Sequence, residues 1–160
     1  MLLLHALLAV AHALSSAAWF GSMFYSLTVM QPRAKRFFAT DAEFEEFVAT
    51  VAQGARWNVL AAFAFVALTG AGLIVVARPQ PVTTAWLVIV ALKIALFAIA
   101  VAIFAYASWR LWPRRIFASP AELPGIRRRF RAVGIALLII AAMSFALGIL
   151  PHTSIGVLPR

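Results

Sequence analysis

The sequence predicts an all-α membrane protein, a bundle of four transmembrane helices that forms one domain over residues 1–160. Hydrophobic residues make up 64% of the chain and charged residues 12%, whereas soluble domains are about half apolar and a quarter charged. The apolar residues gather in four stretches, each long enough to cross a hydrocarbon core about 30 Å thick. The expected spans are about 2–30, 57–77, 84–112 and 132–150. A proline follows each one and is expected to end its helix, since proline has no N–H group to donate.

The basic residues orient these spans. The net charge of +9 could indicate a nucleic-acid partner, but the positions of the charges favour membrane topology instead. The two long segments between spans carry Arg33, Lys35, Arg36, Arg56, Arg110, Arg114, Arg115, Arg127, Arg128, Arg129 and Arg131. Segments rich in Lys and Arg stay in the cytoplasm. We therefore expect a multi-pass protein of a bacterial inner membrane, with both termini periplasmic, the lipid bilayer as partner and no nucleic acid.

The segment between spans one and two predicts a short cytoplasmic amphipathic helix. Thr40 and Glu43 have the spacing of a capping box. Phe44, Phe47 and Val51 then recur at helical spacing and form one apolar face. Elsewhere, no internal repeat is strong enough to indicate duplication.

Lys93 is the most informative residue of the chain. It lies in the middle of the apolar run 85–107 and is the only charge in the body of an expected span. A lysine at such depth costs ~2.5–3.5 kcal/mol on insertion scales, so it is expected to face the bundle interior. The other ionisable groups of the spans are His5 and His12. No span contains a carboxylate, which argues against a proton- or sodium-coupled transporter.

Depth and periodicity bring these residues into one predicted pocket. His12 lies about 15 Å along span one from Leu2, and Lys93 about 13 Å along span three from its start. Both spans run inward from the periplasm, so the two side chains are expected to meet at similar depth. Trp19 continues the histidine stripe inward. The predicted pocket opens to the periplasm and is lined by His5, His12, Trp19, Lys93 and His152.

Imidazole groups suit copper, zinc and haem iron. His5 and His12 are about 10.5 Å apart along a straight helix, so one ion would need ligands from different helices. A copper ion is expected to use His5, His12 and His152, whereas a haem would use His12 as axial ligand. Lys93 would then be a counter-ion for a porphyrin carboxylate, a neutral amine, or a charge that reaches outward to the interface. A structural subunit without ligand is the third alternative.

The residues carry two family resemblances. His12, Trp19, Gly21 and Pro32, with Thr69-Gly70 and the Lys93 helix, resemble the copper-resistance protein D (CopD) family. That resemblance covers most of residues 5–115. It implies an inner-membrane protein linked to copper uptake or tolerance, often beside a periplasmic copper carrier, and so a binding or transport module rather than an enzyme.

Span one is also similar to HemJ-type protoporphyrinogen oxidases, which share the His-x6-Trp helix, a Phe-Tyr pair like Phe24-Tyr25, and an intramembrane lysine. This resemblance implies a four-helix protein that binds haem b and oxidises a porphyrinogen. The chain has Arg127 to Arg131 where an asparagine–glutamate–proline signature is expected before the last helix. A homo-oligomer is compatible with either resemblance.

Overall fold

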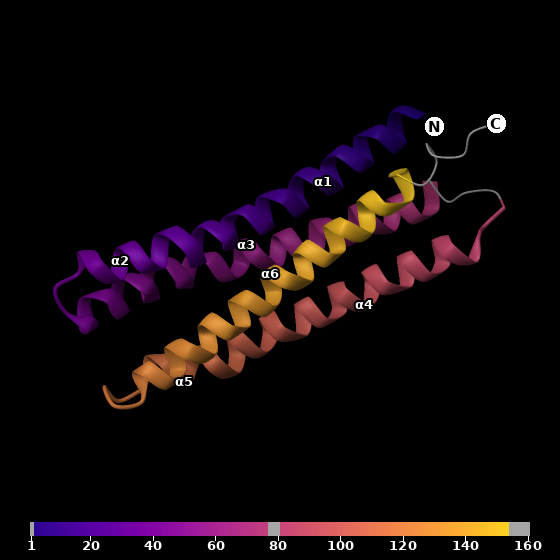
Figure 1. Cartoon of the computed structure of the whole chain (residues 1–160). Coiled ribbons are helices and arrows are strands. Elements are labelled where there is room, and N and C mark those ends of the chain that lie inside the picture. Colours follow the sequence, from indigo (N-terminus) through magenta and orange to yellow (C-terminus); the bar gives the residue numbers. More distant parts are fainter. Residues whose placement is uncertain (1, 77–80, 154–160) are drawn as a thin grey trace.

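The computed structural model of the chain describes the backbone of residues 2–76 and 81–153 and the side chains of 2–76 and 81–149. These residues form four long helical rods, arranged side by side as a bundle (Figure 1). Each rod contains a helix long and apolar enough to cross a membrane. The predicted all-α, four-span fold is therefore confirmed. The elements are α1 (Leu2–Tyr25), η1 (Ser26–Met30), α2 (Gln31–Phe37), α3 (Asp41–Val76), α4 (Thr84–Tyr106), η2 (Ala107–Leu111), α5 (Trp112–Ile116) and α6 (Leu123–Thr153).

The first and third rods do not end at their prolines, so that prediction is wrong. Each rod passes through one wider π turn, η1 or η2, and then resumes as a short α-helix, α2 or α5. Pro32 and Pro113 lie in the first turn of these short helices. A proline is tolerated there because its missing N–H would have had no partner inside the new helix. The fourth rod likewise continues past Pro151 to Thr153.

The predicted amphipathic helix begins where expected, but it is not a separate element. The Glu43 N–H donates to Thr40 Oγ1 at 3.2 Å, and the Thr40 N–H donates to the Glu43 carboxylate at 3.0 Å. From this cap, α3 runs without a break for 36 residues into span two. A helix of that length is about 54 Å long, so its first turns extend beyond a core about 30 Å thick. The expected span starts near residue 57, and the turns before it lie at the end of the bundle that carries the α2–α3 turn.

Four charged side chains connect the helices at this end of the bundle. Arg115 donates to Glu45 at 2.7 and 3.0 Å, and Arg127 donates to Glu45 at 2.8 Å and to Asp41 at 3.1 Å. Burial alone would raise the pKa of Glu45, but the hydrogen bonds and charges of the two arginines hold that pKa below its ordinary value. The cluster joins α3 to α5 and α6 outside the hydrocarbon core.

The four rods form two matching hairpins, a repeat that the sequence alone did not reveal. Tyr25 precedes η1, and Tyr106 precedes η2, 81 residues later. Pro32-Arg33 and Pro113-Arg114 follow with the same spacing of 81. α1 packs on α3, and α4 packs on α6. The starts of α1 and α4 lie at one end of the bundle and the α2–α3 and α5–α6 turns at the other (Figure 1), so the repeats are parallel rather than inverted.

The middle of the bundle is apolar and aromatic. Phe63, Ala100 and Leu137 are buried at its centre, where all four rods contribute. The Phe63 ring lies 5.1 Å from Trp19 and 5.6 Å from Phe97, measured between ring centroids. This core lies between His12 and Lys93, nearer the starts of α1 and α4, and the charged cluster at the other end of the bundle.

Candidate functional site

His12 is held in a defined orientation by Thr69. The imidazole Nδ1 lies 2.9 Å from Thr69 Oγ1, across the contact between α1 and α3. The Thr69 hydroxyl donates its single hydrogen to the carbonyl oxygen of Phe65 at 2.8 Å. In this arrangement its oxygen accepts from His12, which assigns to the neutral ring the tautomer with the proton on Nδ1. The lone pair of Nε2 is left available as a ligand or a base.

Gly70 allows this close approach. A Cβ on Gly70 would lie 3.2 Å from Cε1 of His12, which is tighter than ordinary van der Waals contact. Glycine thus lets the imidazole pack directly against the α3 backbone. Thr69 itself is buried, with 6% of its surface exposed, so the hydrogen bond is shielded from solvent.

Lys93 occupies the corresponding place in the second hairpin. It follows His12 by 81 residues, the spacing that also relates the π turns. Its ammonium abuts Gly148 of α6, where a Cβ would lie 3.1 Å from Nζ. The five acidic residues of the chain are Asp41, Glu43, Glu45, Glu46 and Glu122, all at the end of the bundle opposite the starts of α1 and α4. No Asp or Glu can therefore neutralise Lys93 at its depth.

His12 and Lys93 form the polar part of the candidate site. They lie ten and nine residues from the first residues of α1 and α4, as the depth argument predicts. Trp19 lies two helical turns deeper and packs on Phe63, so it belongs to the aromatic floor beneath the pair.

The outer histidines do not complete a metal cluster within the described residues. His5 is exposed near the start of α1. No group of three His, Cys, Asp or Glu side chains in the described part of the chain could hold a metal ion. The side chain of His152 lies outside the described residues, so the predicted set of His5, His12 and His152 stays a prediction.

The role of Thr69 was missed by the sequence reasoning, although a signal for it exists. Thr69 lies seven residues before the end of α3, which puts it at about the depth of His12 in the antiparallel rod. A hydroxyl on the facing helix at that depth is a candidate partner for an intramembrane histidine. The tautomer that follows from this bond needs the side-chain geometry.

Comparisons of the chain with known protein families, curated proteins and solved structures give no significant match. The resemblances to the CopD family and to HemJ-type oxidases therefore stay predictions.

Proposed function

We propose that this protein is a haem b-binding membrane redox protein, in which His12 is the axial ligand. The single observation that carries the proposal is the hydrogen bond from His12 to Thr69. Histidines that ligate metals commonly use the other ring nitrogen in this way, because a fixed N–H orients the ring and selects the tautomer. In His12 the free nitrogen is Nε2, which suits haem iron.

Lys93 supports haem over a simple metal ion. A lysine with no Asp or Glu at its depth needs an anion from elsewhere, or it bears the full cost of a charge in the membrane. The carboxylates of a porphyrin can supply that anion, while the apolar macrocycle suits an interior formed by Trp19, Phe63 and Phe97. Bound haem would supply one-electron chemistry. The HemJ-type resemblance makes porphyrinogen oxidation the reaction to test.

The site would be reached from the periplasm. Both hairpins begin on that side in the topology that the positive-inside rule favours. His12 and Lys93 then lie in the outer half of a bacterial inner membrane. The chain's own groups would bind and orient the ligand, while the aromatic core beneath them would keep water from crossing.

Copper handling is the second candidate, and the exposure of His5 favours it. His5 lies on the same stripe as His12 and seven residues nearer the periplasm. A copper ion delivered by a periplasmic carrier could be accepted at His5 and passed inward to His12. Copper suits imidazole ligands, and His152 would be the further ligand to test.

Absorption spectroscopy with metal analysis of the purified protein separates the candidates. For haem, the wild type should show a Soret band at about one haem per chain. The band should be lost in His12→Ala and retained in His5→Ala, the matched control on the same helix face. Copper that is lost in both variants, with no Soret band, would contradict the haem proposal and favour copper handling. If the purified protein contains neither haem nor copper, the remaining candidate is a structural subunit without ligand.

A further inference from the structure

The acidic residues of α3 divide between two faces of the helix. Asp41 and Glu45 face the bundle, where Arg127 and Arg115 bind them. Glu43 and Glu46 lie two and five positions after Asp41 and face away from this cluster. Glu43 caps its own helix, and Glu46 forms no ion pair within the described residues. The outward face therefore keeps negative charge in a chain whose net charge is +9.

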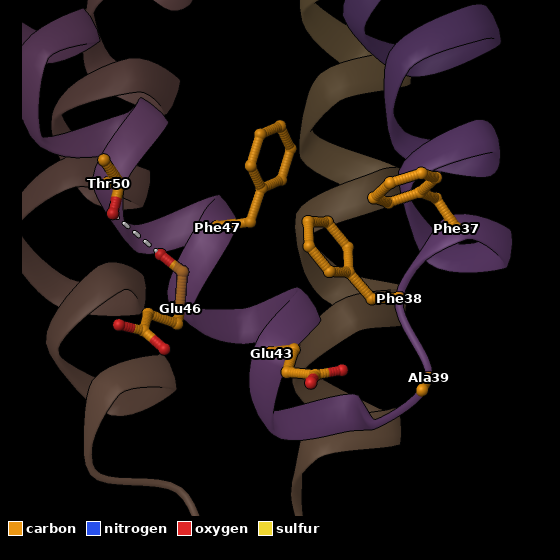
Figure 2. Close-up of a pocket in the computed structure, with 7 residues that line it drawn as sticks. All are labelled: Phe37, Phe38, Ala39, Glu43, Glu46, Phe47 and Thr50. Carbon is orange, nitrogen blue, oxygen red and sulfur yellow. Dashed lines mark hydrogen bonds between the residues drawn. The ribbon is translucent and has the colours of Figure 1, made fainter.

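These two carboxylates border an open hollow at the cytoplasmic tip of the first hairpin, which we call the α2–α3 hollow. It has a volume of ≈ 540 Å³, and its lining residues are Phe37, Phe38, Ala39, Glu43, Glu46, Phe47 and Thr50. Figure 2 shows the three phenylalanine rings gathered on one side and the two carboxylates on the other. The Phe38 ring lies 5.3 Å from both neighbouring rings, and Phe37 is 83% exposed.

An aromatic wall with an acidic rim suits an arginine side chain. A guanidinium group stacks on aromatic faces and also binds carboxylates. The cluster on the inward face of α3 already shows this mode of recognition. Arg127 lies 5.4 Å from the centroid of the Phe44 ring while it pairs with Asp41 and Glu45. The hollow repeats the same combination of groups without an arginine in it.

The chain itself presents arginines at the level of the hollow. Arg128, Arg129 and Arg131 are exposed on α6 and form no ion pair within the described residues. Their level is fixed by the neighbouring Arg127, which binds Asp41 at the start of α3. Copies of a membrane protein share one orientation and one depth, so the hollow of one copy and the arginines of another lie at the same height.

We propose that the α2–α3 hollow is the docking site for the exposed arginines of α6 in a second copy of this chain. The carboxylates would supply charge complementarity, which favours correct encounter and orientation. The phenylalanine rings would supply the apolar contact. The protein would then assemble in the membrane through its cytoplasmic ends, independently of any ligand bound near His12.

Cysteine cross-linking tests the contact directly, because the chain has no cysteine of its own. One tagged copy carries Thr50→Cys, and a second copy with a different tag carries Ala132→Cys. Both positions are exposed. Thr50 lies five residues after Glu45, and Ala132 lies five residues after Arg127. Because Glu45 and Arg127 form an ion pair, Thr50 and Ala132 lie at one level of the bundle. We expect a mixed dimer as the main product in membranes treated with a short bis-maleimide. The control pair, Phe117→Cys with Ala132→Cys, should give only background.

Charge reversal then asks whether the hollow is responsible. Glu46→Lys in the Thr50→Cys copy should lower the cross-linked fraction several-fold, and Arg129→Glu in the other copy should restore it. Glu122→Lys makes the same charge change at the other turn and should have no effect. Thermal melts followed by circular dichroism verify that each variant is folded. Equal yields for the test and control pairs would overturn the proposal. A monomeric protein that binds anionic lipid through these arginines would also overturn it, because the arginines would then contact lipid headgroups.

Discussion

The first hairpin, α1 to α3, and the second, α4 to α6, place one polar side chain each at the same level of the bundle. In the first, His12 is bound by a hydroxyl and packs on a glycine. In the second, Lys93 packs on a glycine. Two similarly built hairpins therefore differ in the group that they present. The first holds an imidazole in a fixed orientation, and the second holds a lysine ammonium on a flexible side chain.

The difference follows from what each group needs. An imidazole has two nitrogens, and a partner must fix one of them before the other has a defined role. Thr69 does this from 57 positions after His12. The residue that the Lys93 ammonium abuts is Gly148, 55 positions later, which has no side chain to direct the amine. An ammonium is a point charge on a flexible stem, and a small neighbour leaves it room to follow a ligand.

Breaking the junction between the hairpins should have the largest effect. Arg127→Ala removes the cation that Asp41 and Glu45 share, and so breaks a contact between α3 of the first hairpin and α6 of the second. The side chains of Arg127 and Glu45 are only 16% and 19% exposed, so the loss should resemble a broken buried pair. We expect the free energy of unfolding to fall by about 3 kcal/mol, measured by thermal or denaturant unfolding in nanodiscs. Arg128→Ala, on the exposed face beside it, should change little. Equal effects of the two variants would contradict this view of the cluster.

Removing the hydroxyl of the first hairpin should sharpen its difference from the second. Thr69→Val keeps the side-chain volume but deletes the group that accepts from His12. Partners of metal-ligating histidines commonly contribute tenfold or more to affinity, so we expect haem affinity to fall by about 10- to 100-fold. The matched control is Ser144→Ala on α6, because that hydroxyl bonds only to the Ile140 carbonyl of its own helix. Haem titration of the apoprotein measures both. An unchanged affinity in Thr69→Val would remove the support for a ligating His12.

The two glycines offer a direct comparison of the two polar groups. A Cβ at Gly70 would press on the His12 ring, which Thr69 holds in place, so Gly70→Ala should destabilise by about 1–3 kcal/mol. A Cβ at Gly148 meets only the end of a flexible lysine, so Gly148→Ala should have a smaller effect. Gly21→Ala is the control, since nothing lies within 4 Å of a Cβ there. A larger loss for Gly148→Ala in thermal unfolding would mean that Lys93 is held as firmly as His12.

Much of the fold could be predicted from sequence because hydropathy and charge bias are strong signals in membrane proteins. The ends of the rods could not be predicted. Whether Pro32 ends a helix or lies in the first turn of the next one depends on the preceding π turn, and no short sequence motif predicts that turn. The repeat was hidden for a related reason. Tyr25 and Tyr106 are identical and lie 81 residues apart. His12 and Lys93 have the same spacing but are chemically unlike, so the sequence does not show that their positions correspond.

The depths of His12 and Lys93 along their helices could be predicted from the sequence, but their contacts could not. Counting residues from the helix starts put His12 and Lys93 at one depth, because helical rise is nearly constant. The partner of each group depends on the rotation of one helix against another, which periodicity alone does not fix. For the same reason, the sequence placed Phe44 and Phe47 on one apolar stripe. In the structure Phe44 is buried beneath Arg127, and Phe47 lines the α2–α3 hollow.

Replacing Lys93 of the second hairpin should change the thermal stability least of all these variants, but it should clearly reduce ligand binding. Lys93→Met has a similar length and no charge, so it removes the penalty of an ammonium that has no protein carboxylate beside it. We expect thermal stability equal to the wild type or slightly higher, together with a loss of ligand binding in the titration used for Thr69→Val. Lys35→Met, in α2 at the other end of the bundle, is the control for removal of one positive charge. A Lys93→Met protein that folds and binds normally would show that the lysine reaches outward to the interface. His12 would then bind the ligand without Lys93, and the two hairpins would have similar backbones but would not contribute to one common site.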